Sequence, residues 1–178
     1  MSLVVGVFAL PIVAVAAVFI IVDDGLPVFF FQRRVGRFEK LFIIVKLRTM
    51  ATSACGDALS PSNATDRRVT RVGRVLRKLS IDELPQLWNV LKGEMSMVGP
   101  RPEMPFVVNR YDDWQHLRHL TRPGLTCIWQ SSYRKTLPLQ SAAATQLDLE
   151  YIQRASPSLD AKLLAQTAFT IIFPKGAY

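Results

Sequence analysis

Two adjacent carboxylates, Asp82 and Glu83, are the residues of this 178-residue sequence best suited to carry out chemistry. They follow an arginine-rich segment. An anionic nucleophile that attacks a phosphoryl group needs the phosphate charge neutralised by arginine, lysine or a divalent metal ion. The cations available for this purpose are Lys46, Arg48, Arg77, Arg101 and Arg122. These residue types permit phosphoryl transfer through a carboxylate.

The same two carboxylates also fit a structural role. The run from Ser80 to Glu83 matches a capping box, in which the serine side chain accepts a hydrogen bond from the amide of Glu83. Acidic residues are common in the first turn of a helix because they complement the helix dipole. Pro85 favours a helix that begins at Asp82, since proline is tolerated in a first turn.

His116 and His119 lie three residues apart on one face of an expected helix. Because no third ligand follows at a fixed spacing, interface histidines are favoured over a metal site. Cys55 and Cys127 have no Cys-x-x-Cys spacing, so neither a zinc site nor a disulfide framework is expected, and free thiols suit a reducing compartment. The glycine-rich phosphate loops are also missing from the sequence, so a nucleotide would have to be bound in another way.

Hydrophobic periodicity predicts the elements that would position these residues. Apolar runs at 28–32 and 41–45 flank the turn-like Val35-Gly36-Arg37 and predict a small hairpin or two strands. Residues 51–66 are rich in small and polar side chains and predict a surface loop. Helices are predicted over residues 67–79, 81–91, 112–120, 147–154 and 159–173.

The helix predicted over residues 67–79 is strongly basic. An apolar stripe alternates with cations and no acid falls among them. The cations are Arg67, Arg68, Arg71, Arg74, Arg77 and Lys78. Such a helix fits a membrane surface, an anionic ligand or a nucleic acid, and equally a solvated face above a stripe packed on a core.

The charge of the chain is unevenly distributed. Its net charge is +8 and 49% of its residues are hydrophobic, which excludes a disordered tail and suits one domain, or one domain with an appendage. Every cation follows an uncharged block at residues 3–22. This block fits either a spanning helix kinked at Pro11, or a helix broken at Leu10 and Pro11 whose arms enter and leave one leaflet. Either arrangement places the basic remainder on the cytoplasmic side.

Four segments together resemble the bacterial sugar transferase family, the small monotopic phosphoglycosyl transferases. The longest begins at Arg74, contains Ser-Ile-Asp-Glu-Leu-Pro-Gln-Leu-Trp-Asn and ends with Gly-Pro-Arg-Pro at Pro102. The others are Lys46-Leu-Arg-Thr-Met50, Arg122-Pro-Gly-Leu-Thr126 and the closing Gly176-Ala-Tyr178. The resemblance covers the chain from about Pro11 to its end.

The resemblance implies a reaction at a membrane. Enzymes of this family move a sugar-1-phosphate from a UDP-sugar onto undecaprenyl phosphate and release UMP. This is the first membrane step in building capsule, exopolysaccharide, O-antigen or glycoprotein glycans. The resemblance further implies a monotopic protein of the bacterial inner membrane with its catalytic domain on the cytoplasmic face. Its partners would be the two substrates and membrane lipids, with a homodimer allowed and no nucleic acid.

The resemblance also implies roles for individual residues. Asp82 would be the nucleophile that forms a covalent phosphosugar intermediate, and Glu83 would support it by positioning or proton handling. Mg²⁺ would bridge these carboxylates and the diphosphate. Arg77 and Arg101 match positions expected to hold phosphates. Further phosphate-binding candidates are Lys46, Arg48 and Arg122.

The implied fold is α+β and mainly helical. Residues 1–25 would form a re-entrant membrane helix broken at Leu10 and Pro11, so the resemblance favours this arrangement over a spanning helix. Residues 26–178 would form a compact catalytic domain with a small β-hairpin and amphipathic helices at the membrane interface.

Two alternatives to an active transferase stay open. The first is a membrane-tethered basic protein that binds anionic lipid or nucleic acid. The second is a catalytically impaired family member, because the chain starts without the basic and aromatic stretch usual in the family. In addition, the family commonly continues with Gly-x-x-Gln-x-x-Gly-Arg after Thr126, whereas this chain keeps Gln130 but has Cys127 and Ser132-Tyr133-Arg134.

Overall fold

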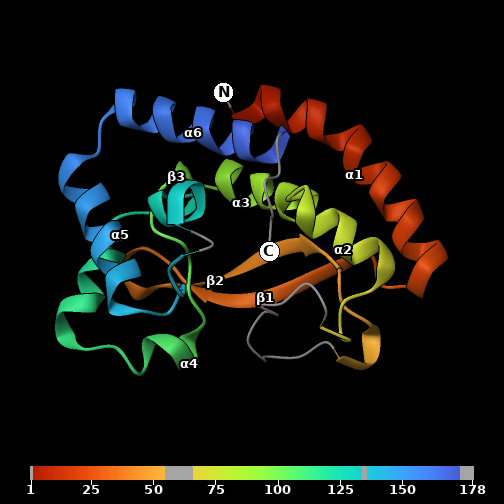
Figure 1. The fold of residues 1–178 in the computed structure, drawn as a ribbon, viewed down its shortest axis with the longest axis horizontal. Coiled ribbons are helices and arrows are strands. Elements are labelled where there is room, and N and C mark those ends of the chain that lie inside the picture. The colour runs from red at the N-terminus through yellow and green to blue at the C-terminus, as the bar shows by residue number, and fades with distance from the viewer. Residues whose placement is uncertain (1, 55–65, 134–135, 173–178) are drawn as a thin grey trace.

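The computed structural model of the chain describes residues 2–54, 66–133 and 136–172. Its helices and strands are α1 (Ser2–Asp24), β1 (Phe29–Val35), β2 (Leu41–Leu47), α2 (Arg71–Lys78), α3 (Leu87–Leu91), β3 (Ser96–Val98), α4 (Pro105–Val108), β4 (Gly124–Thr126), α5 (Ala142–Arg154) and α6 (Pro157–Ile172). Short 3-10 helices occupy Arg37–Glu39, Thr52–Ala54, Ile81–Gln86 and Asp113–Leu120, and a π-helical turn occupies Trp129–Tyr133. The expected class, α+β and mainly helical, is confirmed (Figure 1).

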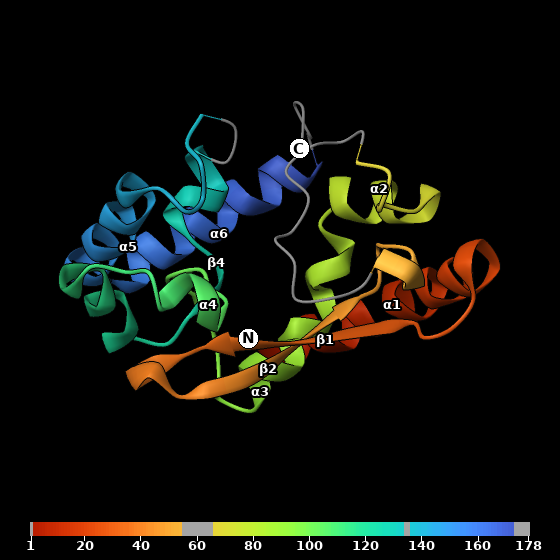
Figure 2. The same ribbon diagram turned by 90° about the horizontal axis from the view of Figure 1, so that it is seen from below.

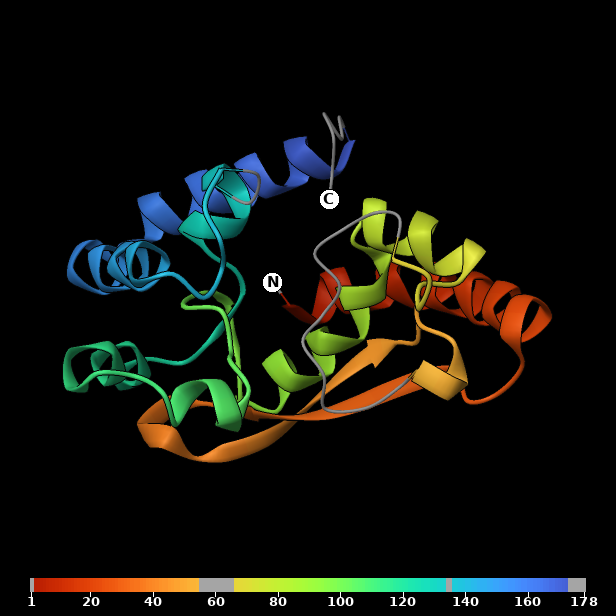
Figure 3. The same cartoon turned by 60° about the horizontal axis from the view of Figure 1, so that its bottom comes forward.

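A long antiparallel hairpin runs along one side of the molecule. β1 pairs with β2 from Phe29 opposite Leu47 to Val35 opposite Leu41. This confirms the predicted hairpin and extends both strands beyond the predicted runs. Figures 2 and 3 show the hairpin passing beneath two groups of helices, with α1 and α2 at one end and α4 and α5 at the other.

One hydrophobic core joins α1 to the hairpin and to α2. Its buried members are Ala16 and Ile20 of α1, Leu47 of β2 and Leu76 of α2. Burying an aliphatic side chain of this size contributes about 1.5–3 kcal/mol relative to leaving it exposed. The second half of α1 is therefore packed on the body of the protein.

A second core lies under the C-terminal helices. Val98 of β3, Tyr151 of α5 and Leu163 of α6 are buried together. The Tyr151 hydroxyl also donates to Asp160 Oδ1 at 2.8 Å, which ties α5 to the first turn of α6. This core packs against the short sheet formed by β3 and β4.

β3 and β4 form a two-stranded parallel sheet, with Ser96 opposite Gly124 and Val98 opposite Thr126. A Cβ atom added at Gly124 would lie 2.1 Å from Gly99 N, which is closer than real Cβ contacts allow. Only glycine permits this approach. Two motifs singled out in the sequence, Gly-Pro-Arg-Pro and Arg-Pro-Gly-Leu-Thr, therefore meet at one place in the fold.

The segment after α2 differs from the predicted helix over 81–91. Residues 81–86 are a 3-10 helix that contains Pro85, and only Leu87–Leu91 is α-helical. Ser80 has φ 54° and its side chain makes no capping hydrogen bond, so the predicted capping box is wrong. An N-cap residue needs extended backbone for its side chain to reach the amide three residues on, and the left-handed geometry of Ser80 prevents this.

The other predicted helices are found at the expected positions, but their ends differ from the predicted ones. α2 is shorter than the predicted 67–79, α5 begins earlier than the predicted 147–154, and α6 matches the predicted 159–173 as far as residue 172. The segment predicted as a helix over 112–120 is a 3-10 helix. Most of the predicted loop at 51–66 lies outside the described residues, as do Cys55, Arg134 and the closing Gly176-Ala-Tyr178.

α1 continues through Pro11 without an interruption. The expected break at Leu10 and Pro11 is therefore absent from this helix, and the re-entrant membrane segment is not confirmed. Proline removes one helical hydrogen bond, but its fixed φ is itself helical, so a helix can bend there and continue. Within the described residues, no helix combines the length and apolar character needed to cross a bilayer.

The outward face of α1 is nevertheless apolar. Large hydrophobic side chains on this face are strongly exposed, with Val22 at 80% of its maximal accessible area. The others described on the helix are Leu10, Ile12, Val15, Val18, Phe19 and Ile21. An exposed apolar surface of this kind marks a site of interaction with a membrane or another protein.

Candidate active site

Glu83 lies at the centre of a largely buried cluster of charged side chains. Its Oε1 atom is 2.8 Å from Lys46 Nζ and 2.8 Å from Arg101 Nη2. Lys46 comes from β2, Glu83 from the 3-10 helix Ile81–Gln86 and Arg101 from the turn after β3. The fold therefore brings three of the predicted site residues together from separate parts of the chain.

The cluster keeps Glu83 ionised. Burial by itself raises the pKa of a carboxyl group, but Arg101 and Lys46 outweigh burial and hold the pKa of Glu83 well below its usual range. The pKa of Arg101 is raised because the attraction of Glu83 exceeds the cost of burying the guanidinium. Lys46 and Arg101 place two cations at one carboxylate, and cations of this kind can interact with a polyanionic ligand.

Asp82 is buried on the same 3-10 helix as Glu83. Burial lowers the pKa of Lys46, and the negative charges of Glu83 and Asp82 oppose this shift. Asp82 therefore shares the electrostatic environment of the cluster. Its assignment as a nucleophile stays a prediction.

Gln130 is a site residue that the sequence reasoning did not select. Its Oε1 accepts a hydrogen bond from Arg101 Nη1 at 2.7 Å, and its Nε2 lies 3.2 Å from Glu83 Oε2 and donates to it. The backbone N–H of Gln130 also donates to the buried Cys127 Sγ at 3.4 Å. Its retention within a segment that otherwise departs from the family pattern is the signal that could have identified it.

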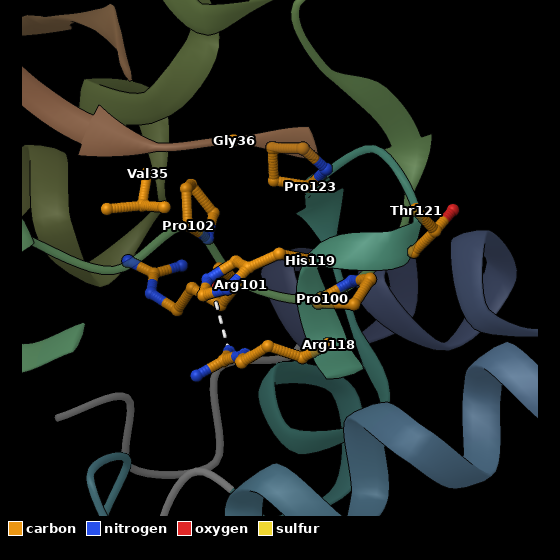
Figure 4. A pocket seen from close by; sticks show the side chains of 9 residues that line it. All are labelled: Val35, Gly36, Pro100, Arg101, Pro102, Arg118, His119, Thr121 and Pro123. Atoms are coloured by element: carbon orange, nitrogen blue, oxygen red, sulfur yellow. Dashed lines mark hydrogen bonds between the residues drawn. The ribbon is translucent and has the colours of Figure 1, made fainter. Parts of the chain in front are cut away.

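Arg101 is supported through its backbone. Arg118 Nη2 donates to Arg101 O at 2.9 Å and lies 2.5 Å from Asp148 Oδ2. Figure 4 shows Arg101 and Arg118 at the wall of a small pocket between the end of β1 and the turns around β3 and β4. The pocket is lined by Val35, Gly36, Pro100, Arg101, Pro102, Arg118, His119, Thr121 and Pro123.

Arg34 and Glu103 add a second pair of charges beside the cluster. Arg34 Nη1 lies 3.9 Å from Glu103 Oε2 and donates to Pro102 O at 3.1 Å. Burial lowers the pKa of Arg34 to about 10, although the charges of Glu103 and Glu83 oppose this. Neither Arg34 nor Glu103 was predicted as a site residue, because their role depends on how β1 packs against the turn after β3.

The described contacts of Arg48 lie at the end of α1, and its role in phosphate binding stays a prediction. It donates to the backbone oxygens of Asp24 at 2.9 Å and Gly25 at 2.6 Å, and pairs with the Asp24 carboxylate at 3.2 Å. Cations at a helix C-terminus satisfy carbonyl groups that have no partner within the helix. Arg48 therefore stabilises the end of α1 and the turn into β1.

Arg77 and Arg122 also make no described contact with Glu83. Arg77 Nε donates to Thr49 Oγ1 at 2.8 Å, which joins α2 to the segment after β2. Arg122 is exposed on the turn before β4. Their role in phosphate binding stays a prediction.

Comparison with known proteins identifies the family to which the chain belongs. The family model described as Bacterial sugar transferase matches residues 1–174. The chain belongs to the bacterial sugar transferase family. The resemblance carried by the four sequence segments is thereby confirmed, and Asp82, Glu83 and Arg101 lie within the longest of them.

Several curated relatives are phosphotransferases by name. The chain is 38% identical over 176 residues to the UDP-N-acetylgalactosamine-undecaprenyl-phosphate N-acetylgalactosaminephosphotransferase of Aeromonas hydrophila, covering 94% of this chain and 40% of the relative. It is 39% identical over 178 residues to the undecaprenyl-phosphate glucose phosphotransferase of Komagataeibacter xylinus, covering 94% of this chain and 34% of the relative.

A shorter relative is covered more completely. The UDP-glucose:undecaprenyl-phosphate glucose-1-phosphate transferase of Caulobacter vibrioides is 38% identical over 190 residues, which cover 99% of this chain and 68% of the relative. By contrast, the chain spans about two fifths or less of the two longer relatives described above.

Proposed function

We propose that this chain is a phosphoglycosyl transferase that moves a sugar-1-phosphate from a UDP-sugar to undecaprenyl phosphate and releases UMP. The observation that carries the proposal is Glu83, which is largely buried, is held by Lys46 and Arg101, and is adjacent in sequence to the buried Asp82. Membership of the family supports it, as do the names of relatives that specify undecaprenyl phosphate and UDP-sugars.

The proposed reaction consists of two displacements at one phosphorus atom. A carboxylate oxygen of Asp82 attacks the phosphorus that carries the sugar, an O–P bond forms, and the O–P bond to UMP breaks so that UMP leaves with the electron pair. A phosphate oxygen of undecaprenyl phosphate then attacks the same phosphorus and displaces Asp82 as a free carboxylate. The products are the lipid-linked sugar diphosphate and the regenerated enzyme.

Glu83 acts by positioning in this proposal. A general base must be able to gain a proton near the working pH, and the depressed pKa of Glu83 makes it a poor one. Its carboxylate instead fixes the positions of Lys46 and Arg101. These cations, together with Arg34, would neutralise the diphosphate as charge moves onto the departing UMP.

Mg²⁺ fits the donor set of Asp82 and Glu83. This ion prefers hard oxygen ligands and is commonly held by one or two carboxylates together with substrate phosphates. Lys46, Arg101 and Gln130 use three acceptor positions of Glu83, and a carboxylate offers about four, so one position is left for a metal ion. When bound, Mg²⁺ would supply further neutralisation of the diphosphate.

We also propose that the protein works as a monotopic enzyme on the cytoplasmic face of the bacterial inner membrane. The lipid acceptor requires a membrane surface, and the exposed apolar side chains of α1 offer a face that could enter one leaflet. The basic residues of α2 are suited to bind the anionic headgroups of the cytoplasmic leaflet.

Release of UMP from a panel of UDP-sugars, with undecaprenyl phosphate and with or without Mg²⁺, tests the proposal. We expect Mg²⁺-dependent release with one sugar preferred. Asp82→Asn should lower turnover by at least about 1,000-fold, because loss of a nucleophile removes the chemical step. Without acceptor, the intact mass of the wild-type protein should rise by one sugar phosphate, and that of Asp82→Asn should not.

Membrane association of Asp82→Asn is the control, and it should equal that of the wild type. Retained turnover in Asp82→Asn would contradict the nucleophile assignment. A protein that only binds anionic lipid or nucleic acid would release no UMP from any donor, and that result would overturn the proposed activity.

A further inference from the structure

The tip of the β1–β2 hairpin meets both histidines of the chain. The sequence contains two histidines, His116 and His119, and both face Glu39 of the turn. His116 Nδ1 lies 2.6 Å from Glu39 Oε1, and His119 Nδ1 lies 3.7 Å from the same oxygen. One potential ligand atom from each residue falls within 4.8 Å of the other two. This group does not include any residue of the Glu83 cluster.

The local backbone explains why the two rings lie on the same side. Residues Asp113–Leu120 form a 3-10 helix, in which side chains three residues apart lie directly above one another. A capping box between Asp112 and Gln115 fixes the start of this helix. The two imidazole rings are 6.1 Å apart, and the ring of Tyr111 stacks on His119 at 6.2 Å.

A separate contact holds the hairpin tip against this helix. Arg37 Nε donates to Leu120 O at 3.2 Å, so the 3-10 turn Arg37–Glu39 is anchored independently of the histidines. The backbone of Glu39 is in the left-handed conformation, with φ 58°. The three side chains are therefore brought together before any ligand binds.

His119 has an unmet hydrogen-bonding requirement. Its side chain is only 8% exposed, and Nδ1 is fully buried without a hydrogen-bond partner among the described residues. The 3.7 Å separation from Glu39 is too long for a hydrogen bond. A neutral imidazole nitrogen carries a lone pair that can bind a metal ion.

We propose that Glu39, His116 and His119 bind a divalent transition-metal ion of the zinc type, with the fourth position left to water. Two imidazoles and one carboxylate are a ligand set used by Zn²⁺. Donor atoms around a tetrahedral ion with bonds of about 2.0–2.1 Å are about 3.3 Å apart. Glu39 and His116 would separate slightly to reach this geometry, and both are partly exposed and free to do so.

The metal ion would link the tip of the β1–β2 hairpin to the 3-10 helix Asp113–Leu120, which carries Arg118. His119 is adjacent in sequence to Arg118, whose guanidinium donates to Arg101 O at 2.9 Å. Both residues line the pocket shown in Figure 4. A metal ion that joins Glu39 to this helix would therefore restrict the motion of Arg118 and, through it, of Arg101. The inference does not depend on the proposed transferase activity.

Zn²⁺ binding to the chelator-treated full chain, prepared without a histidine tag, tests the site. Calorimetric titration is carried out with excess Mg²⁺ present to occupy oxygen-only sites. We expect one Zn²⁺ per chain, a higher Tm with Zn²⁺, and a visible absorption band of tetrahedral Co²⁺ when cobalt replaces zinc. Glu39→Gln and His116→Ala should each weaken Zn²⁺ binding by at least about 10–100-fold.

Glu150→Gln is the matched control, because Glu150 is an exposed carboxylate paired with Arg154 on α5. It should bind Zn²⁺ as the wild type does. Since Glu39 and His116 are partly exposed, their variants should keep the wild-type circular dichroism spectrum and metal-free Tm. Stoichiometric Zn²⁺ binding that is unchanged in both variants would overturn the site, and so would the absence of a Zn²⁺-dependent rise in Tm.

Discussion

Glu83 is bound to two cations and one amide, so its removal should affect more than one contact. In Glu83→Gln, Lys46 and Arg101 would remain buried without their counter-charge. Breaking one side of a buried ion pair costs about 3–5 kcal/mol. We expect the free energy of unfolding at pH 7, measured in urea, to fall by about 3 kcal/mol. The exposed-pair variant Glu150→Gln should change it by less than about 1 kcal/mol.

The same carboxylate should make stability depend on pH. The pKa of Glu83 is lowered in the folded protein relative to its ordinary value of 4.5. The unfolded chain therefore takes up this proton first as pH falls, and the stabilisation present above pH 4.5 is lost below it. The stability difference between wild type and Glu83→Gln should shrink as pH falls from 6 toward 3. A difference that stays constant over this range would contradict the assignment.

Gln130 holds Glu83 and Arg101 in a fixed relation through the two ends of its amide. Replacing it with an apolar side chain of similar size, Gln130→Leu, should leave Arg101 free to shift. A displacement of about 1 Å in an active site can reduce turnover by about 100-fold. We expect kcat for UMP release to fall by this order. Gln153→Leu, at an exposed position of α5, should retain wild-type turnover.

The glycine contact between β3 and β4 makes a prediction at the level of the element. Gly124→Ala would place a methyl group 2.1 Å from Gly99 N, so the two strands must move apart. Since Arg101 follows β3 directly, we expect lower stability and lower turnover together. Gly6→Ala is the matched control, because nothing lies within 4 Å of its added Cβ. Thermal unfolding and UMP release measure both effects, and a Gly124→Ala protein with wild-type Tm would contradict the close contact.

The elements themselves were predictable where the signal is local. The apolar runs of β1 and β2 and the periodicity of α5 and α6 depend on neighbouring residues, and these elements were found in place. Helical periodicity does not separate a 3-10 helix from an α-helix, so residues 81–86 and 113–120 were assigned to the wrong type. Ser80 has a left-handed conformation that no local sequence pattern reveals.

The site was predictable in part for the same reason. Asp82, Glu83 and Arg101 belong to one motif, and Lys46 lies in another that the family resemblance identified. Arg34 required knowledge of how β1 packs. Glu39 is 77 positions away from His116, so the sequence offered no reason to join them. Arg48 was correctly recognised as part of a motif, but the structure places it at the end of α1.

At the scale of the whole molecule, α1 has two different faces. One face packs on β2 and α2, and the other exposes large apolar side chains. Replacing two exposed residues, Phe19→Asn and Val22→Asn, should lower sedimentation with anionic phospholipid vesicles and leave Tm nearly unchanged. Leu117→Asn, at an exposed position outside α1, is the control and should sediment as the wild type does. Unchanged sedimentation of the α1 variant would contradict a membrane role for this face.

The pairing of β3 with β4 brings together two segments of the chain that are separated by about 25 residues. Residues 99–124 form a long loop whose two ends, Gly99 and Gly124, lie in contact with each other. The entropy of closing such a loop grows only slowly with its length. Insertions between α4 and Asp112 should therefore be tolerated, provided that Tyr111 still contacts His119 and Arg118 still reaches the carbonyl of Arg101. A longer segment at this position should leave the charged cluster unchanged.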